Sequence, residues 1–110
     1  MAACFELGKT AKGQFNFALK GADGQSLLRS EQYDSKPSAQ NGIASVQSNS
    51  GNDARYEKKT ASDGRHYFNL KAGNHQVIGT SPMYADEAAC NAAIAATKAA
   101  GSTTTVNDNS

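Results

Sequence analysis

The sequence contains no tryptophan, two cysteines, two histidines and no long hydrophobic run. No window approaches the roughly 18 apolar residues of a membrane-spanning helix, so we expect no membrane span. Cys4 and Cys90 lie far apart and form no Cys-x-x-Cys motif. In a chain without an export signal we expect both to be free thiols. The opening residues, MAACFELGKT, have no basic segment followed by an apolar run. We therefore expect no signal peptide and a cytoplasmic location.

An excess of charge of either sign is also missing. Eleven basic side chains stand against ten acidic ones, for a formal net charge of +1. This balance removes the general electrostatic attraction that would hold a protein on nucleic acid or on an anionic membrane. A chain of 110 residues with 38% apolar residues can form a thin core. Residues 1–110 are therefore predicted to form a single domain.

The sequence does contain an internal repeat. When the chain is aligned with itself at an offset of 51 positions, residues 5–46 match residues 56–97 without a gap, and ten of the 42 pairs are identical. The clearest part is FNFALK at residues 15–20, which returns as YFNLK at residues 67–71. An ungapped match of this length indicates a duplicated structural unit.

Each repeat begins with strand-like alternation. Phe15, Phe17 and Leu19 point to one side of the predicted second strand, and the residues between them point to the other. A hairpin turn follows at Ala22-Asp23-Gly24, where glycine accepts a positive φ. A two-residue turn would place Leu27 opposite Lys20. A three-residue turn places Leu27 opposite Leu19, and Ile78 opposite Leu70 in the second repeat, and we favour it because it buries the bulky residue in both copies.

Helical patterns follow the strands. Asp34 or Ser35 can cap a helix that runs to about Asn49, with an apolar stripe at Ala39, Ile43 and Val46. In the second repeat Asp86 is the predicted cap of a helix over residues 88–100. The matching stripe is Cys90, Ile94 and Thr97, and Gly101 is the expected stop after the helix.

These elements predict an α+β fold. Two tandem βββα units, residues 4–50 and 55–101, should share one antiparallel sheet with both helices on one face and a pseudo-twofold axis between the units. Residues 102–110 should form a short C-terminal strand and tail, with Thr103 to Val106 as the β-branched edge strand. A single unit of about 50 residues buries too little surface to be stable alone. The intact chain is therefore expected to be a monomer.

The strings FNFALKGADGQ, SEQY and NGIASVQSN resemble the YegP-like family, small bacterial domains that occur singly or as tandem pairs. The resemblance covers residues 4–100, and the second copy departs from it where SPMY replaces SEQY and NAAIAAT replaces NGIASV. It implies an α+β fold in which two units share one sheet. It implies no activity.

No catalytic, metal or cofactor constellation is recognisable in the sequence. His66 takes the place of Phe15 on the apolar face and His75 lies in the second hairpin loop, so the two should not converge on a metal ion with Cys90. Cys90 on a helix core face is expected to be a packed hydrophobe. The alternative to a binding protein is a small enzyme with a site near His66, Tyr84 and Cys90, which would need a lowered thiol pKa.

The helix-free face of the predicted sheet is the preferred place for a function. It should expose an aromatic ring among lysines and asparagines, and Leu28 and Gly79 are also expected there. Lys20 and Lys71, and Ser30 and Ser81, recur in both repeats. We predict a non-catalytic binding or interaction module for a protein or a single-stranded nucleic acid. The candidate binding residues are Asn16, Lys20, Ser30, Arg65, Tyr67, Lys71 and Ser81.

Overall fold

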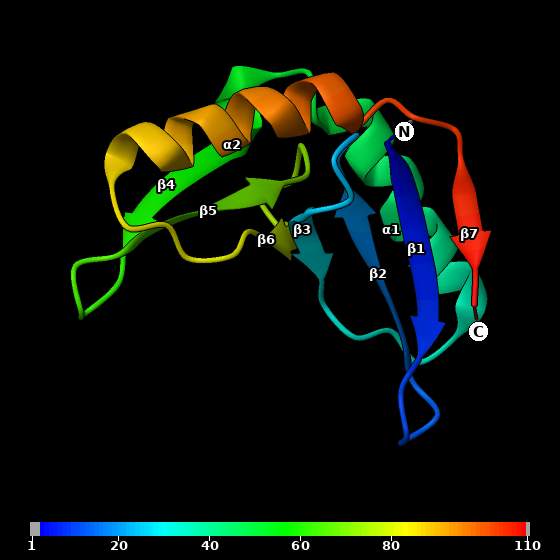
Figure 1. The fold of residues 1–110 in the computed structure, drawn as a ribbon. Coiled ribbons are helices and arrows are strands. Elements are labelled where there is room, and N and C mark those ends of the chain that lie inside the picture. Colours follow the sequence, from blue (N-terminus) through cyan, green and yellow to red (C-terminus); the bar gives the residue numbers. More distant parts are fainter. Residues whose placement is uncertain (1–2, 110) are drawn as a thin grey trace.

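A computed structural model describes residues 3–109. Two three-stranded units, each followed by a helix, appear in the predicted order, and a short seventh strand closes the chain (Figure 1). The elements are β1 (Cys4–Lys9), β2 (Phe15–Lys20), β3 (Ser26–Ser30), α1 (Lys36–Asn49), a 3-10 turn (Asp53–Arg55), β4 (Tyr56–Thr60), β5 (His66–Lys71), β6 (Val77–Thr80), α2 (Glu87–Ala100) and β7 (Val106–Asp108). The predicted α+β fold of two βββα units is confirmed.

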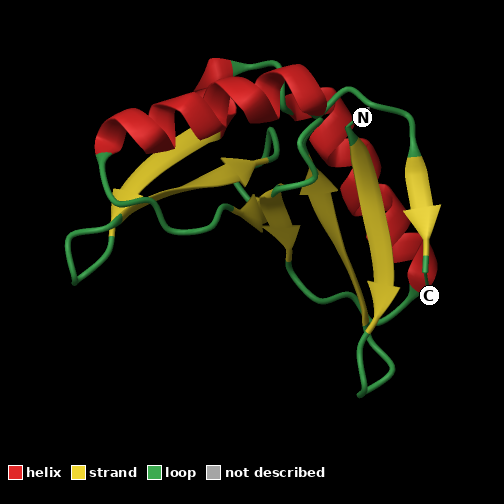
Figure 2. Ribbon diagram, viewed as in Figure 1, coloured by secondary structure: helices red, strands yellow, loops and turns green. Residues whose placement is uncertain are grey.

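All seven strands form one sheet in the order β4-β5-β6-β3-β2-β1-β7. The six repeat strands pair antiparallel, whereas β7 runs parallel to β1 along its outer edge. The antiparallel sheet predicted for the two βββα units is therefore confirmed, and the parallel last strand makes the complete sheet a mixed one. The sheet curves strongly, and both helices lie on its outer side, which leaves the inner side without helices (Figure 2).

The pseudo-twofold axis passes between β3 and β6. These strands pair Arg29 with Thr80, and Thr80 is the residue 51 positions after Arg29. A pair that relates a residue to its own equivalent lies on the axis that exchanges the two repeats. The C-terminal ends of the helices meet at a second such pair, Ser50 and Gly101.

One hydrophobic core joins the repeats. Leu19 and its equivalent Leu70 are both fully buried, and Phe17 and its equivalent Phe68 are 2% and 0% exposed. The predicted stripe of α1 is confirmed, because all three of its residues are buried. In α2, Cys90 and Thr97 are buried as predicted, but Ala93 is buried in place of the half-buried Ile94. Within the described residues 3–109, neither helix is long and apolar enough to cross a membrane.

The predicted hairpin register is correct at the turn and wrong beyond it. Lys20 pairs with Ser26, as expected for a three-residue turn, but Leu19 pairs with Leu28, so Leu27 forms a β-bulge. The second hairpin has the same irregularity, and Leu70 pairs with Gly79 instead of Ile78. A bulge lets two successive residues turn toward the core. Both leucines of β3 are accordingly buried.

The helix ends follow the predicted caps. The side chains of Ser35 and Asp86 accept hydrogen bonds from the backbone N–H groups of Ser38 and Ala89. Gly101 follows α2 as predicted but has a φ of −67°, so it does not adopt the left-handed conformation of a glycine stop. Glycine is needed there for space, because a Cβ atom would lie 2.3 Å from Cβ of Ser50.

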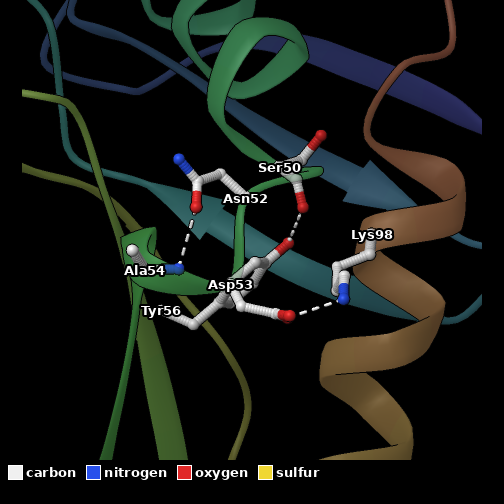
Figure 3. A network of polar contacts seen from close by, with 6 residues as sticks. All are labelled: Ser50, Asn52, Asp53, Ala54, Tyr56 and Lys98. Carbon is white, nitrogen blue, oxygen red and sulfur yellow. Dashed lines mark hydrogen bonds and ion pairs between the residues drawn. The ribbon is translucent and has the colours of Figure 1, made fainter.

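The link between the repeats is fixed by polar contacts (Figure 3). The hydroxyl of Tyr56 donates to the carbonyl of Ser50 at 2.6 Å, and burial raises the pKa of this phenol. Lys98 of α2 donates to Asp53 at 2.6 Å. Asn52 accepts a hydrogen bond from the N–H of Ala54. The second repeat thus starts at a defined position against both helices.

Candidate functional site: the helix-free hollow of the first repeat

The bulges decide which side chains reach the inner, helix-free face of the sheet. Arg29 pairs with Ala18 and with Thr80, and Ala18 also pairs with Glu6. These positions share the inner face. Leu28 and Gly79 were expected there but belong to the core side. Leu28 is 0% exposed, and a Cβ atom on Gly79 would lie 2.8 Å from Cγ of Leu28.

The inner face of the first repeat is hollowed. The cavity has a volume of about 460 Å³ and is open to solvent. Residues of β1, β2 and β3, with Gln32 after β3 and Asn109 after β7, surround it. We call this cavity the first-repeat hollow. Its lining residues are Glu6, Leu7, Gly8, Asn16, Phe17, Ala18, Lys20, Ser26, Arg29, Ser30, Gln32 and Asn109.

Small residues create the hollow. Gly8 and Ala18 line it, whereas the second repeat has Lys59 and Asn69 at the equivalent positions. Asn69 also accepts a hydrogen bond from the hydroxyl of Thr80 at 2.7 Å, which further fills the second half of the face. The duplicated fold therefore carries two different surfaces on its two halves.

Most polar side chains of the hollow make no close hydrogen bond or ion pair within the described residues. Lys20 Nζ lies 3.9 Å from a carboxylate oxygen of Glu6, which is a long ion pair. Between residues 3 and 109, no hydrogen bond or ion pair engages the side chains of Arg29, Asn16 or Gln32. A guanidinium without a carboxylate partner and free carboxamides are groups that can bind a ligand without first breaking an internal contact.

Ser30 and Ser81 have a structural role that explains their recurrence. Each hydroxyl accepts a hydrogen bond from the backbone N–H of a phenylalanine, Phe17 at 2.8 Å and Phe68 at 2.9 Å. Each also donates to the carbonyl of the next residue. Ser81 is buried. A three-residue turn without a bulge would pair Asn16 with Ser30 and Tyr67 with Ser81, but the bulge shifts each serine to the neighbouring phenylalanine.

The candidates of the second repeat lie apart from the hollow. Arg65 donates to the carboxylate of Asp63 at 2.7 Å, and its backbone and side-chain N–H groups lower the pKa of that carboxyl. Lys71 lies 3.0 Å from Glu57 and, as its hydrogen-bond partner, lowers the pKa of Glu57. Tyr67 pairs with Lys59 in the β4–β5 ladder. Only Asn16, Lys20 and Ser30 of the predicted set line the hollow.

The alternative site near His66, Tyr84 and Cys90 is present as a small cavity of about 140 Å³. His66 and Cys90 line it, and Tyr84 joins His66 only through two backbone hydrogen bonds. Cys90 is fully buried, and burial raises the pKa of its thiol. A buried thiol with a raised pKa is a poor nucleophile at neutral pH. Within residues 3–109, no group of three potential metal ligands is found.

The sequence pattern did not reveal Arg29, Gly8, Gln32 or Asn109 as parts of a site. Arg29 was missed because a regular ladder would place it opposite Phe17, on the core side, and only the bulge turns it to the inner face. The adjacent leucines at positions 27 and 28 were the available signal, since two neighbouring apolar residues in a half-buried strand are typical of a bulge. Asn109 reaches the hollow through the parallel strand β7.

Comparison with known proteins supports this architecture. The family model described as a domain of unknown function, DUF1508, matches the chain twice, at residues 11–57 and 61–108. The UPF0339 protein YegP of Escherichia coli K12 is 56% identical over 109 residues, which cover 99% of each chain. A UPF0339 protein of Shewanella oneidensis is 48% identical and covers 98% of each chain. The chain belongs to this family of tandem DUF1508 proteins.

Solved structures of these relatives have the same fold. The solution structure of YegP from Escherichia coli, described as a protein of unknown function, gives a TM-score of 0.93 and covers 99% of this chain and 94% of that one. The solution structure of the Shewanella oneidensis protein gives a TM-score of 0.92 at 48% sequence identity, and the match covers 98% of this chain and 92% of that one. The resemblance to the YegP-like family is confirmed, and the family is one of unknown function.

Proposed function

We propose that the chain is a non-catalytic binding module whose ligand occupies the first-repeat hollow. The observation that carries the proposal is the uncommitted guanidinium of Arg29 beside free carboxamides in a cavity of about 460 Å³. Cavities of roughly 300–1,000 Å³ are typical of ligand sites. The cavity lining contains a single carboxylate and no histidine or cysteine, which favours binding over acid–base or thiol catalysis there. A cytoplasmic location stays a prediction.

The experiment places a photo-crosslinking amino acid at Gln32, on the rim of the hollow, in cells of a bacterial host. Met83 is the matched control, because it is the equivalent residue of the second repeat and is also exposed. Binding in the hollow predicts a discrete product from position 32 that is absent from position 83 and that disappears in an Arg29→Thr background. Equal products from both positions, or a product from position 83 alone, would contradict the proposal.

A further inference from the structure

Arg29 lies at the centre of the sheet with small neighbours. Its side chain is exposed and stands between Ala18 and Thr80 on the inner face. Among residues 3–109, the ion pairs within the sheet do not include Arg29. They join Lys20 to Glu6, and Lys71 and Lys59 to Glu57. A guanidinium presents parallel N–H donors in a planar fork, which matches the two oxygens of a carboxylate.

The net charge of the hollow suits a ligand that carries one negative charge. Its lining contains Lys20 and Arg29 as cations and Glu6 as the single acid, for a formal charge of +1. Glu6 lies near Lys20 and partly neutralises it. A polyanion would meet the Glu6 carboxylate as well as the two cations. A single carboxylate can approach Arg29 from the side of the free amides.

The remaining polar groups suit a peptide backbone. Asn16, Gln32 and Asn109 present carboxamides, each with donor and acceptor atoms that match a peptide group. The bases of a single-stranded nucleic acid would instead need aromatic faces on which to stack. The phenylalanine of the lining, Phe17, is 2% exposed, and Tyr67 lies in the other half of the face.

We propose that the first-repeat hollow binds a carboxylate carried by an extended peptide, with Arg29 as the anion-binding group. The carboxylate belongs either to an Asp or Glu side chain or to a peptide C-terminus. This inference rests on the proposed binding function and adds the class of ligand to it.

The test is a titration of the ¹⁵N-labelled chain followed by amide chemical shifts. Acetyl-Gly-Asp-Gly-amide supplies a side-chain carboxylate and acetyl-Gly-Gly-Gly supplies a C-terminal one. Acetyl-Gly-Asn-Gly-amide is the neutral control, and an octathymidylate tests nucleic acid. The reporters are the amides of Gly8, Ala18 and Arg29, and the comparison amides are Lys59 and Asn69, which are equivalent to Gly8 and Ala18 in the second repeat. Thr80 is not used for comparison because it pairs with Arg29.

At least one carboxylate peptide should shift the reporters of the first repeat only, and the neutral peptide should not. Arg29→Thr, which installs the residue of the second repeat, should weaken this binding about tenfold or more, since a charge-assisted pair is lost. Lys71→Ala should change it by less than about twofold, because Lys71 lies outside the hollow.

Equal shifts with the neutral peptide, no effect of Arg29→Thr, or no shift at all would overturn the carboxylate assignment. Shifts with octathymidylate alone would assign the hollow to nucleic acid. The proposed function is judged separately by the cross-link at Gln32. If that cross-link forms while both carboxylate peptides fail, the binding function stands and only the ligand class is wrong.

Discussion

The contact between the ends of the two helices gives a sharp prediction about stability. In Gly101→Ala, the new Cβ atom would lie 2.2 Å from Oγ and 2.3 Å from Cβ of Ser50. Overpacking of this kind costs about 1–3 kcal/mol. The better helix propensity of alanine returns up to about 1 kcal/mol. We therefore expect a net loss of about 1–2 kcal/mol in the free energy of unfolding.

A second substitution, Ser50→Gly, should restore the stability that Gly101→Ala loses. Ser50→Gly removes the two atoms nearest to the new methyl group and leaves the carbonyl oxygen of Thr97 at 3.0 Å. No described residue hydrogen-bonds the buried hydroxyl of Ser50. The double variant Ser50→Gly/Gly101→Ala should therefore recover most of the lost stability. Urea unfolding followed by circular dichroism measures each variant, and the coupling free energy should be about 2 kcal/mol. Additive effects of the two substitutions would refute the contact across the pseudo-twofold axis.

Three further predictions concern the core and the duplication. Native Cys90 should react with iodoacetamide at least about tenfold more slowly than the unfolded chain, because it is fully buried and its pKa is raised; fast labelling of the folded protein would revive the enzyme alternative. Ser81→Ala should cost about 1–3 kcal/mol in urea unfolding by leaving the buried N–H of Phe68 unpaired, and a neutral effect would contradict the structural role of the serine. Residues 1–52 alone should dimerise or stay largely unfolded, which sedimentation and circular dichroism can establish; a folded monomeric half would contradict the need for a shared core.

Much of the fold could be predicted from the sequence because its signals are local or duplicated. The alternation of Phe15, Phe17 and Leu19 and its return in the second repeat define matching strands. The caps at Ser35 and Asp86 come from the local hydrogen bonding of short polar side chains, and both are confirmed. The turn at Gly24 was also readable, since its φ of +83° is one that glycine accepts.

The site could be predicted only in part because it depends on one bulge and on one non-local pairing. The bulge at Leu27 exchanges the faces of Leu28 and Arg29, and a strict alternation assigns both to the wrong side. The parallel pairing of β7 brings Asn109 to the hollow, and no local pattern indicates its direction. Recurrence in both repeats was misleading for Ser30, because the fold itself uses that hydroxyl.

On the proposed function, one half of a duplicated surface carries the binding site. The most direct measurement compares Lys20→Ala with Lys71→Ala, the same change at equivalent positions, by the yield of the photo-cross-link at Gln32. Lys20 lines the hollow and Lys71 does not. Both are partly exposed, so neither variant should shift the melting temperature by more than a few degrees, at about 0.5 kcal/mol each.

A binding site confined to the first repeat predicts a strong loss of cross-linked product in Lys20→Ala and an unchanged yield in Lys71→Ala. Equal losses would show that the two halves act together, and a loss in Lys71→Ala alone would move the site to the second repeat. Either result would contradict a binding site confined to the first repeat.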